Sequence, residues 1–205
     1  HRRPRPRRHR PPRGRHAGDG GKAALFKQFA DVDAWPPLAL DTTDTEEIIR
    51  TVKAIAPPGF GGVNLEDISA PPRCFEIEKR LREELDIPPV FHDDQHGTAI
   101  VVLAALINAL KVVNKKIEDV RIAVSGVGAA GSAIIRLLLA QGAKDIIGFD
   151  RHGGALTPES AGDDENRTWI VENTNPSGFT GTLKEGLVGG PTSSSASRPA
   201  TSSRA

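Results

Sequence analysis

Residues 120–150 contain the feature that most constrains how this chain can fold. A short apolar run, Val120–Ser125, leads into a glycine-rich turn, Gly126–Gly131, which is followed by a helical run. A second apolar run, Asp145–Asp150, then ends in an acid. A strand, a helix and a second strand in this order are typical of a β-α-β unit with parallel strands. The sequence therefore predicts an α/β fold organised around this unit.

The three glycines of the turn have separate physical roles. Gly126 permits a tight turn, Gly128 lets backbone N–H groups approach a pyrophosphate, and Gly131 lets the helix pack against the strand. Phosphates would then lie at a helix N-terminus, where N–H groups and the helix dipole stabilise negative charge. If the glycines only formed a tight turn and Asp150 only capped the next element, three glycines at this spacing would have no explanation. We therefore predict dinucleotide binding.

The choice between NAD and NADP is open. Asp150 can accept hydrogen bonds from the ribose hydroxyls and would repel a 2′-phosphate, which favours NAD, whereas Arg151 and His152 could receive that phosphate. The residues expected to bind the dinucleotide are Gly126, Gly128, Ala129, Ala130, Gly131, Asp150 and Arg151.

Composition excludes several other classes of protein. The chain has 205 residues, of which 38% are hydrophobic, enough for one domain or for one domain and part of another. A net charge of +1 argues against a nucleic-acid partner. Asn108 and Lys111 interrupt the longest apolar run, Ala99–Val113, so we predict no membrane span. The single cysteine, Cys74, cannot form an internal disulfide, which suits a cytoplasmic location.

The two ends of the chain differ from the middle. Residues 1–20 are rich in Arg, Pro and His and are expected to form a disordered basic arm, and residues 189–205 are expected to form a disordered Ser- and Thr-rich tail. If both ends are back-translated with chosen GC-rich codons, a one-base shift of that hypothetical reading frame gives apolar, glycine-containing sequence. Because the chain also contains no Met, we expect a fragment with frameshifted ends.

Between the ends, apolar periodicity predicts further helices and strands. Residues 41–44 supply capping groups for the second of these helices. The expected helices cover residues 23–30, 46–56, 71–85 and 183–188, and a polar helix or loop is expected over residues 159–172. The expected strands cover residues 35–40, 60–68 and 87–91.

Two of these strands end in pairs of acids. Glu66 and Asp67 end one strand, and Asp93 and Asp94 follow the other. Carboxylate oxygens in excess of local positive charge are the ligands of hard cations, so we predict Mg²⁺ or Mn²⁺. The alternative is that these acids only cap helices and form turns. The neighbouring residues His92 and His96 lack zinc-site spacing, so roles in turns or in support of the metal ligands are favoured for them.

Four segments carry a resemblance to a known family. Gly21–Ala23, Phe60–Ala70, Val90–Ala99 and Val124–Gly131 resemble the bacterial malic enzymes, and the resemblance extends from about Lys22 to Leu187. It implies oxidation of malate with NAD⁺ or NADP⁺ and decarboxylation of the bound oxaloacetate to pyruvate, with Mg²⁺ or Mn²⁺. It also implies that the intact family member is a homo-oligomer.

The resemblance assigns roles to individual residues. Glu66, Asp67 and Asp94 would be the metal ligands. Lys22 matches the lysine that removes the proton of the C2 hydroxyl, and Asp93 would hold and tune that lysine. A lysine acts as a base near neutral pH only when its pKa is lowered, which burial and a nearby cation would do.

The chain also departs from the family pattern. It contains no Tyr, although the family uses a tyrosine to protonate the enol, and the arginine that binds the substrate carboxylate is unassigned. We therefore expect impaired malic activity. One alternative is a non-catalytic remnant or interaction module that binds nucleotide or metal. Another is an amino-acid or folate dehydrogenase, which would share the glycine turn without needing the paired acids.

The expected domain organisation follows from these assignments. Residues 21–95 would form part of a malate- and metal-binding α/β domain, and residues 96–188 part of an incomplete Rossmann-like dinucleotide domain. The metal would lie at their junction.

Overall fold

The computed structural model describes residues 16–56, 60–68, 71–86 and 89–188. The predictions made for residues 1–15 and 189–205, including the shifted reading frame, lie outside the described residues. The chain divides into two compact units, His1–Ile48 and Ile49–Ala205, each described here by itself. This division does not coincide with the expected boundary at residue 95, which falls inside a continuous helix.

Helix α1 (His16–Ala30) and the loop that follows it make up most of the described part of the first unit. Residues 16–20, which we expected to be disordered, are helical, because each residue added to an existing helix gains one backbone hydrogen bond. The strand expected over residues 35–40 is absent. Pro36 and Pro37 lie in its middle and cannot donate to a β-ladder.

Helix α2 (Thr45–Ile55) confirms the helix and the caps predicted for this region. Asp44 Oδ1 accepts a hydrogen bond from the backbone N–H of Glu47 at 2.8 Å, and the Thr42 hydroxyl accepts one from the Asp44 N–H at 3.1 Å. These side chains satisfy N–H groups that a helix N-terminus leaves without partners.

The second unit begins with a small β-α-β unit. Strand β1 (Val63–Leu65) leads through helix α3 (Arg73–Glu84) to strand β2 (Val90–His92), and the two strands pair in parallel, with Leu65 opposite His92. Strand β1 is shorter than predicted, and residues 87 and 88 of the other predicted strand lie outside the described residues. On the inner face of α3, Cys74, Ile77 and Leu81 are fully buried. This i, i+3, i+7 spacing is the apolar stripe of an amphipathic helix.

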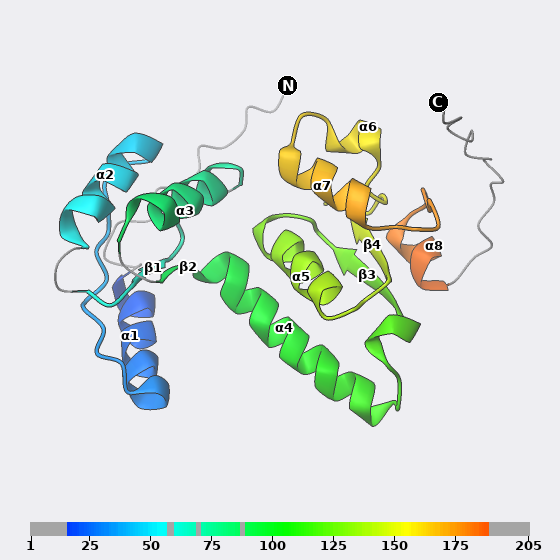
Figure 1. The fold of residues 1–205 in the computed structure, drawn as a ribbon, viewed down its shortest axis with the longest axis horizontal. Helices are drawn as coiled ribbons and strands as arrows, with labels where there is room; N and C mark the ends of the chain where they lie inside the picture. Colours follow the sequence, from blue (N-terminus) through cyan, green and yellow to red (C-terminus); the bar gives the residue numbers. More distant parts are fainter. Residues whose placement is uncertain (1–15, 57–59, 69–70, 87–88, 189–205) are drawn as a thin grey trace, which may run out of the picture. The chain divides into compact units, whose positions relative to one another are not determined.

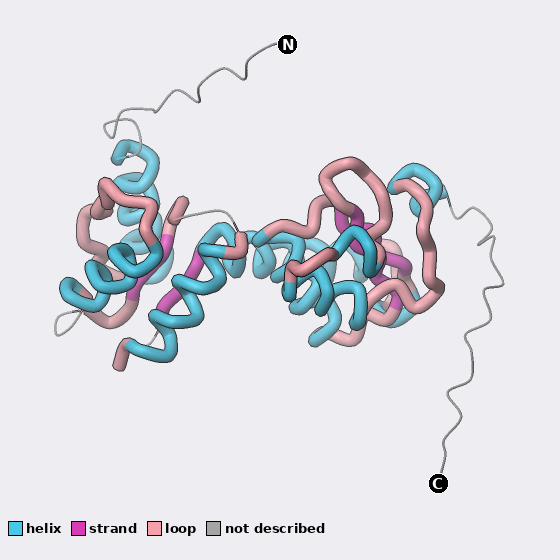
Figure 2. Tube along the Cα trace, turned by 90° about the horizontal axis from the view of Figure 1, so that it is seen from above, coloured by secondary structure: helices cyan, strands magenta, loops and turns pink. Residues whose placement is uncertain are grey.

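Helix α4 (Asp93–Val112) starts directly after β2 and leads through the short 3₁₀ helix η2 (Ile117–Asp119) to a second β-α-β unit. Here β3 (Arg121–Ser125), α5 (Ala129–Ala140) and β4 (Asp145–Phe149) match the three predicted elements. The strands pair in parallel from Arg121 opposite Asp145 to Ser125 opposite Phe149. Helix α4 lies alongside α5 (Figure 1). The two pairs of strands form separate sheets, as Figure 2 shows.

Length and composition alone would allow α4 to cross a membrane. Core helices of other proteins pass the same test, so a single helix of this kind is weak support for a membrane span. In this structure Leu103 and Leu106 of α4 pack against the core beside β3 and β4. The absence of a membrane span stays a prediction.

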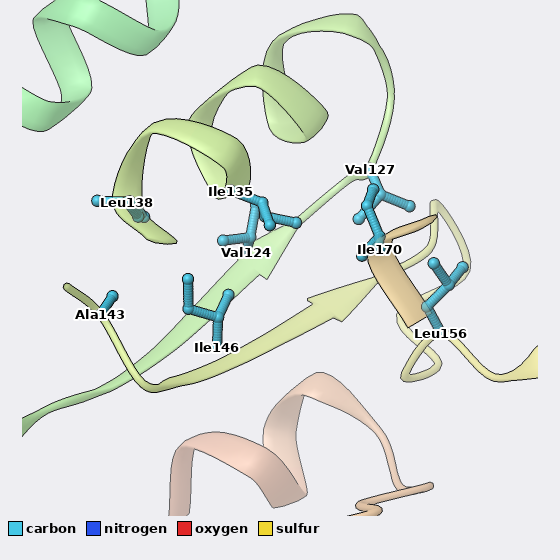
Figure 3. Packing of buried hydrophobic residues seen from close by; sticks show 8 residues of the cluster. All are labelled: Val124, Val127, Ile135, Leu138, Ala143, Ile146, Leu156 and Ile170. Atoms are coloured by element: carbon cyan, nitrogen blue, oxygen red, sulfur yellow. The ribbon is translucent and has the colours of Figure 1, made fainter. Parts of the chain in front are cut away.

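The second sheet is covered on both faces. On one face the core contains apolar side chains from α5, both strands and helix α7 (Glu165–Asn173), which point into one space in Figure 3. On the other face, Ile147 and Phe149 pack with Phe179 and Leu183, the first residue of α8 (Leu183–Val188). Burial on both faces is typical of parallel strands. The first core consists of Val124, Val127, Ile135, Leu138, Ala143, Ile146, Leu156 and Ile170.

The chain between β4 and α8 forms two helices, α6 (Pro158–Ala161) and α7. Thr157 and Ser160 form a capping box at the start of α6, and Asp164 caps α7 through the backbone N–H groups of Asn166 and Arg167. The prediction of a polar helix or loop over residues 159–172 is therefore confirmed as two capped helices.

Candidate nucleotide and metal sites

The glycine-rich turn joins β3 to α5 in a conformation that requires glycine at two positions. Gly126 has a φ of 90°, which a residue with a Cβ rarely adopts, and its N–H donates to the Phe149 carbonyl oxygen at 2.9 Å. A Cβ on Gly131 would overlap the carbonyl oxygen of Gly126. The expected roles of Gly126 in the tight turn and of Gly131 in close helix packing are confirmed.

Gly128 differs from these two glycines. It is the N-cap of α5, its φ is −81°, and a Cβ built on it would meet no protein atom within 4 Å. Gly128 caps the helix without a side-chain hydrogen bond. The N-terminus of α5, with Ala129 and Ala130 in its first turn, therefore has open space in front of it and carries the positive end of the helix dipole. This arrangement suits the phosphates of a dinucleotide.

Asp150 lies just after β4 and is held by the turn that follows. Its Oδ1 atom accepts hydrogen bonds from the backbone N–H groups of His152 at 2.8 Å and Gly154 at 3.1 Å. These donors lower the pKa of the Asp150 carboxyl from its ordinary value, so the group stays ionised. Arg151 Nε donates to His152 Nε2 at 3.1 Å, which leaves the two candidate phosphate ligands in contact with each other.

The acidic ends of β1 and β2 lie at the same edge of the first sheet. Because Leu65 pairs with His92 in a parallel ladder, the next residues, Glu66 and Asp93, leave the sheet on the same side. Asp67, with a φ of 50°, turns the chain immediately afterwards. Asp94 lies beside Asp93 in the first turn of α4. The pattern of strands delivering carboxylates to one place, predicted from the sequence, is therefore present in the backbone.

The carboxylate side chains at this edge are not gathered into a cluster. Within the described ranges, no three His, Cys, Asp or Glu side chains lie close enough together to hold a metal ion. Glu66 Oε2 accepts a hydrogen bond from Asn64 Nδ2 at 3.0 Å, and the Asp93 carboxylate lies against Gly97. The donors share a sheet edge and are of the type that Mg²⁺ prefers, so they fit the cation in chemistry. The ligand set stays a prediction.

The two histidines near this edge have other partners. His92 is fully buried, with Nδ1 3.3 Å from Gln95 Oε1 and Nε2 3.6 Å from Asp94 Oδ2, too far for a good hydrogen bond. His96 Nε2 lies 2.6 Å from Oε1 of Glu78, a buried carboxylate on α3. The expectations drawn from the sequence did not include Glu78 as a buried group. The signal was its place one turn after Cys74, on the apolar face of the predicted helix.

Lys22 lies half-buried in the second turn of α1, in the first compact unit. Asp93, its predicted partner, lies in the second unit. The contact between them stays a prediction.

Comparisons with known proteins connect both sites to one family. Residues 95–152 match the family model described as "Malic enzyme, NAD binding domain". The chain is 60% identical over 171 residues to the NAD-dependent malic enzyme of Geobacillus stearothermophilus. The aligned residues cover 82% of this chain and 34% of that protein. It is 54% identical over 122 residues to the NADP-dependent malic enzyme of Escherichia coli (strain K12), covering 60% of this chain and 16% of that one.

Solved structures give the same result. The crystal structure of the NAD-dependent malic enzyme from Thermotoga maritima matches with a TM-score of 0.78 and 48% sequence identity, over 87% of this chain and 47% of that one. The malic enzyme of Pyrococcus horikoshii matches with a TM-score of 0.72 and 47% identity, over 82% of this chain and 39% of that one. The chain thus spans about a third of the length of the curated relative from Geobacillus and about half of the Thermotoga structure.

Proposed function

We propose that this chain, which belongs to the malic enzyme family, supplies the dinucleotide turn and the metal-binding strand ends of an NAD(P)-dependent malate dehydrogenase that decarboxylates its product. The observation that carries the proposal is the open N-terminus of α5 behind the turn Gly126–Gly131, with ionised Asp150 at the end of the neighbouring strand. These are the two features with which a β-α-β unit binds pyrophosphate and ribose.

The proposed reaction balances without a further co-substrate. Lys22 accepts the proton of the malate C2 hydroxyl at Nζ while the C2 hydride passes to the nicotinamide ring, which leaves oxaloacetate. The C3–C4 bond then breaks, CO₂ leaves, and the electron pair passes into the enolate of pyruvate. Protonation at C3 returns the proton taken from the hydroxyl. Malate and NAD(P)⁺ thereby give pyruvate, CO₂ and NAD(P)H.

The acids of the first sheet have two roles in this proposal. Glu66, Asp67 and Asp94 would hold Mg²⁺ or Mn²⁺, and Asp93 would hold and tune the Lys22 amine. A divalent ion, when bound, lowers the pKa of the C2 hydroxyl and stabilises negative charge on that oxygen. The parallel pairing of β1 with β2 supports this assignment, because it brings both acidic segments to one edge. The intact protein would act as a homo-oligomer.

The preferred cofactor in this proposal is NAD⁺. Asp150 is held ionised at the position where a 2′-phosphate would approach, and like charges repel. The Geobacillus relative, at 60% identity, is named NAD-dependent, whereas the Escherichia coli relative is named NADP-dependent.

Binding of Mn²⁺ and of NAD⁺ tests the two halves of the proposal separately. Isothermal titration of the full chain should show both ligands binding. Asp94→Asn should weaken Mn²⁺ at least about tenfold, the scale of losing one charged ligand, and leave NAD⁺ affinity unchanged. Asp119→Asn, at an acid in the short 3₁₀ helix η2, is the matched control and should change neither. Equal Mn²⁺ affinity in Asp94→Asn and the unsubstituted chain would contradict the ligand assignment.

A second function is favoured by one observation, the absence of Tyr from the chain. Without a phenol to protonate the enol, this polypeptide on its own would bind nucleotide and metal with little turnover. Protection from thermal unfolding by NAD⁺, together with no pyruvate formed from malate and Mn²⁺, would support this binding module. Measurable pyruvate formation would favour the enzyme.

A further inference from the structure

We infer that Ser132 and Asn166 are positioning residues that set the orientation of the glycine-rich turn for the pyrophosphate of the dinucleotide. Ser132 lies in the first turn of α5, and only 1% of its surface is exposed. Its hydroxyl donates to the carbonyl oxygen of Val127, inside the turn, at 3.2 Å. This inference rests on the proposed dinucleotide binding.

Asn166 fixes the direction of that hydrogen bond. Its Nδ2 donates to Ser132 Oγ at 2.6 Å across 34 residues of sequence. A hydroxyl has one hydrogen and two lone pairs, and one lone pair of Oγ accepts from the amide, so the amide does not compete for the hydrogen. The hydrogen of Ser132 is therefore left for Val127. The backbone of Asn166 is held in turn by Asp164, whose Oδ1 accepts its N–H at 3.0 Å.

Arg136 fixes the orientation of the Asn166 amide. Its Nη2 donates to Asn166 Oδ1 at 3.2 Å, and its guanidinium lies 3.7 Å above the centre of the Trp169 ring. With Oδ1 facing an obligate donor, the Nδ2 of Asn166 must face Ser132. Three side chains from α5 and α7 thus form one directed chain that ends at the Val127 carbonyl.

Peptide geometry converts this chain of hydrogen bonds into a preference for an anion. A trans peptide points its C=O and N–H in opposite directions. The peptide bonds of the glycine-rich turn are trans, since the cis bond among the described residues is Pro71–Pro72. Since the Val127 carbonyl faces Ser132, the N–H of Gly128 points away from it. The Gly128 carbonyl accepts from the Ser132 backbone N–H at 2.9 Å, so the N–H of Ala129 points out of the helix N-terminus. Both N–H groups are therefore set before a phosphate arrives.

The competing explanation is that Asn166 only joins α7 to α5. That role would affect the stability of the fold and not the recognition of phosphate. The two explanations differ for ligands with and without a pyrophosphate, because only the pyrophosphate would contact the turn. ADP-ribose and adenosine share the same adenosine group and therefore form a suitable pair of probes.

The experiment compares the full chain with Asn166→Ala, Asn166→Asp and Asn173→Ala. Asn173 is the matched control, since it lies on the same helix and its amide donates to the Trp169 carbonyl oxygen at 2.7 Å, within its own helix. Calorimetry gives the affinities for NAD⁺, ADP-ribose and adenosine, and thermal unfolding gives stability. We expect ADP-ribose and NAD⁺ to bind about 3- to 10-fold more weakly to Asn166→Ala, the range of one lost hydrogen bond. Adenosine should bind within a factor of two.

The Asn166→Asp variant adds a test of direction. The ionised carboxylate that it introduces cannot donate, and it would take the hydrogen of Ser132 away from Val127. We expect this variant to weaken ADP-ribose at least as much as Asn166→Ala does. If Asn166→Ala does not fold, Asn166→Asp decides the matter, because it keeps the shape of the side chain and an acceptor for Arg136.

Each outcome separates the inference from the proposed function. Failure of the unsubstituted chain to bind NAD⁺ would overturn the proposed function, and the inference with it. Binding of NAD⁺ that is equally strong in the Asn166 variants would overturn the inference alone. A loss that is equal for ADP-ribose and adenosine would also overturn it, in favour of the purely structural role. A loss for ADP-ribose alone, absent in Asn173→Ala, supports it.

Discussion

Replacing Gly128 and Gly131 separately by alanine should divide ligand binding from stability within one turn. The two positions are three residues apart, and the substitution adds the same methyl group. At Gly131 the new Cβ would overlap the backbone oxygen of Gly126, which cannot rotate away as a side chain can. At Gly128 the new Cβ would meet no protein atom within 4 Å, and its φ of −81° is accessible to alanine.

The expected magnitudes follow from these contacts. Overpacking in a close-packed region costs about 1–3 kcal/mol, so Gly131→Ala should lower the melting temperature by roughly 2–12 °C in a domain of this size. Gly128→Ala should change the free energy of unfolding by no more than about 1 kcal/mol, the usual cost of Ala at an N-cap. Its methyl group would instead occupy the space where phosphate approaches the N–H groups. We expect NAD⁺ affinity to fall about tenfold or more, as when a ligand loses charge-assisted hydrogen bonds.

Chemical denaturation and calorimetric titration of the two variants in parallel would measure both quantities. The reasoning is refuted if Gly131→Ala is as stable as the unsubstituted chain, since the overlap with the Gly126 oxygen would then be relieved at no cost. It is equally refuted if Gly128→Ala binds NAD⁺ normally. Loss of both properties in both variants would mean that the turn folds only as a whole.

Three further predictions concern single side chains. Backbone donors lower the pKa of Asp150 in the folded state. Its contribution to stability is therefore complete above the ordinary pKa of 3.8 and disappears as the pH falls through the lower folded value. In urea unfolding, the stability of Asp150→Asn should differ from that of the unsubstituted chain at pH 7, and the two should converge in strong acid. Asp150→Ser should raise the affinity for NADP⁺ only while Arg151 is present. Calorimetric titration of the double variant Asp150→Ser, Arg151→Ala checks this, and a gain that persists in the double variant would contradict it. His96→Ala should destabilise the fold by about 1–3 kcal/mol, because it removes the partner 2.6 Å from buried Glu78. His96→Gln keeps a donor and should lose less stability. Equal losses of stability in denaturant titrations would count against a hydrogen-bonding role for His96.

Local patterns in the sequence were sufficient to predict the elements around both sites. The glycine spacing and two apolar runs located β3, α5 and β4, because each glycine answers a constraint within a few residues of itself. The acids after β1 and β2 were expected at one edge, since parallel strands end on the same side of a sheet. The same kind of pattern gave a wrong prediction for residues 35–40, which do not form the expected strand. Their apolar residues resemble a strand, but Pro36 and Pro37 deny it the hydrogen bonds of a ladder.

Contacts between distant parts of the chain were beyond prediction from one sequence. Asn166 meets Ser132 across 34 residues, and neither residue belongs to a recognisable motif. Helical spacing places Glu78 on the apolar face of α3, but it does not identify His96, 18 residues away, as its partner. In both cases the position of one element against another decides which polar side chains are paired, and periodicity contains no information on that position.

The continuity of α4 gives the two sites a physical connection. Its first turn carries Asp93 and Asp94, and further along the helix Leu103 and Leu106 pack against the core under α5. Twenty residues of α-helix extend about 30 Å and bend little. Helix α5, whose N-terminus faces the proposed phosphate position, is therefore in contact with the helix that carries the acids. The domain boundary predicted at residue 95 falls inside this continuous helix, so the two acids and the leucines that pack on the second core belong to one element.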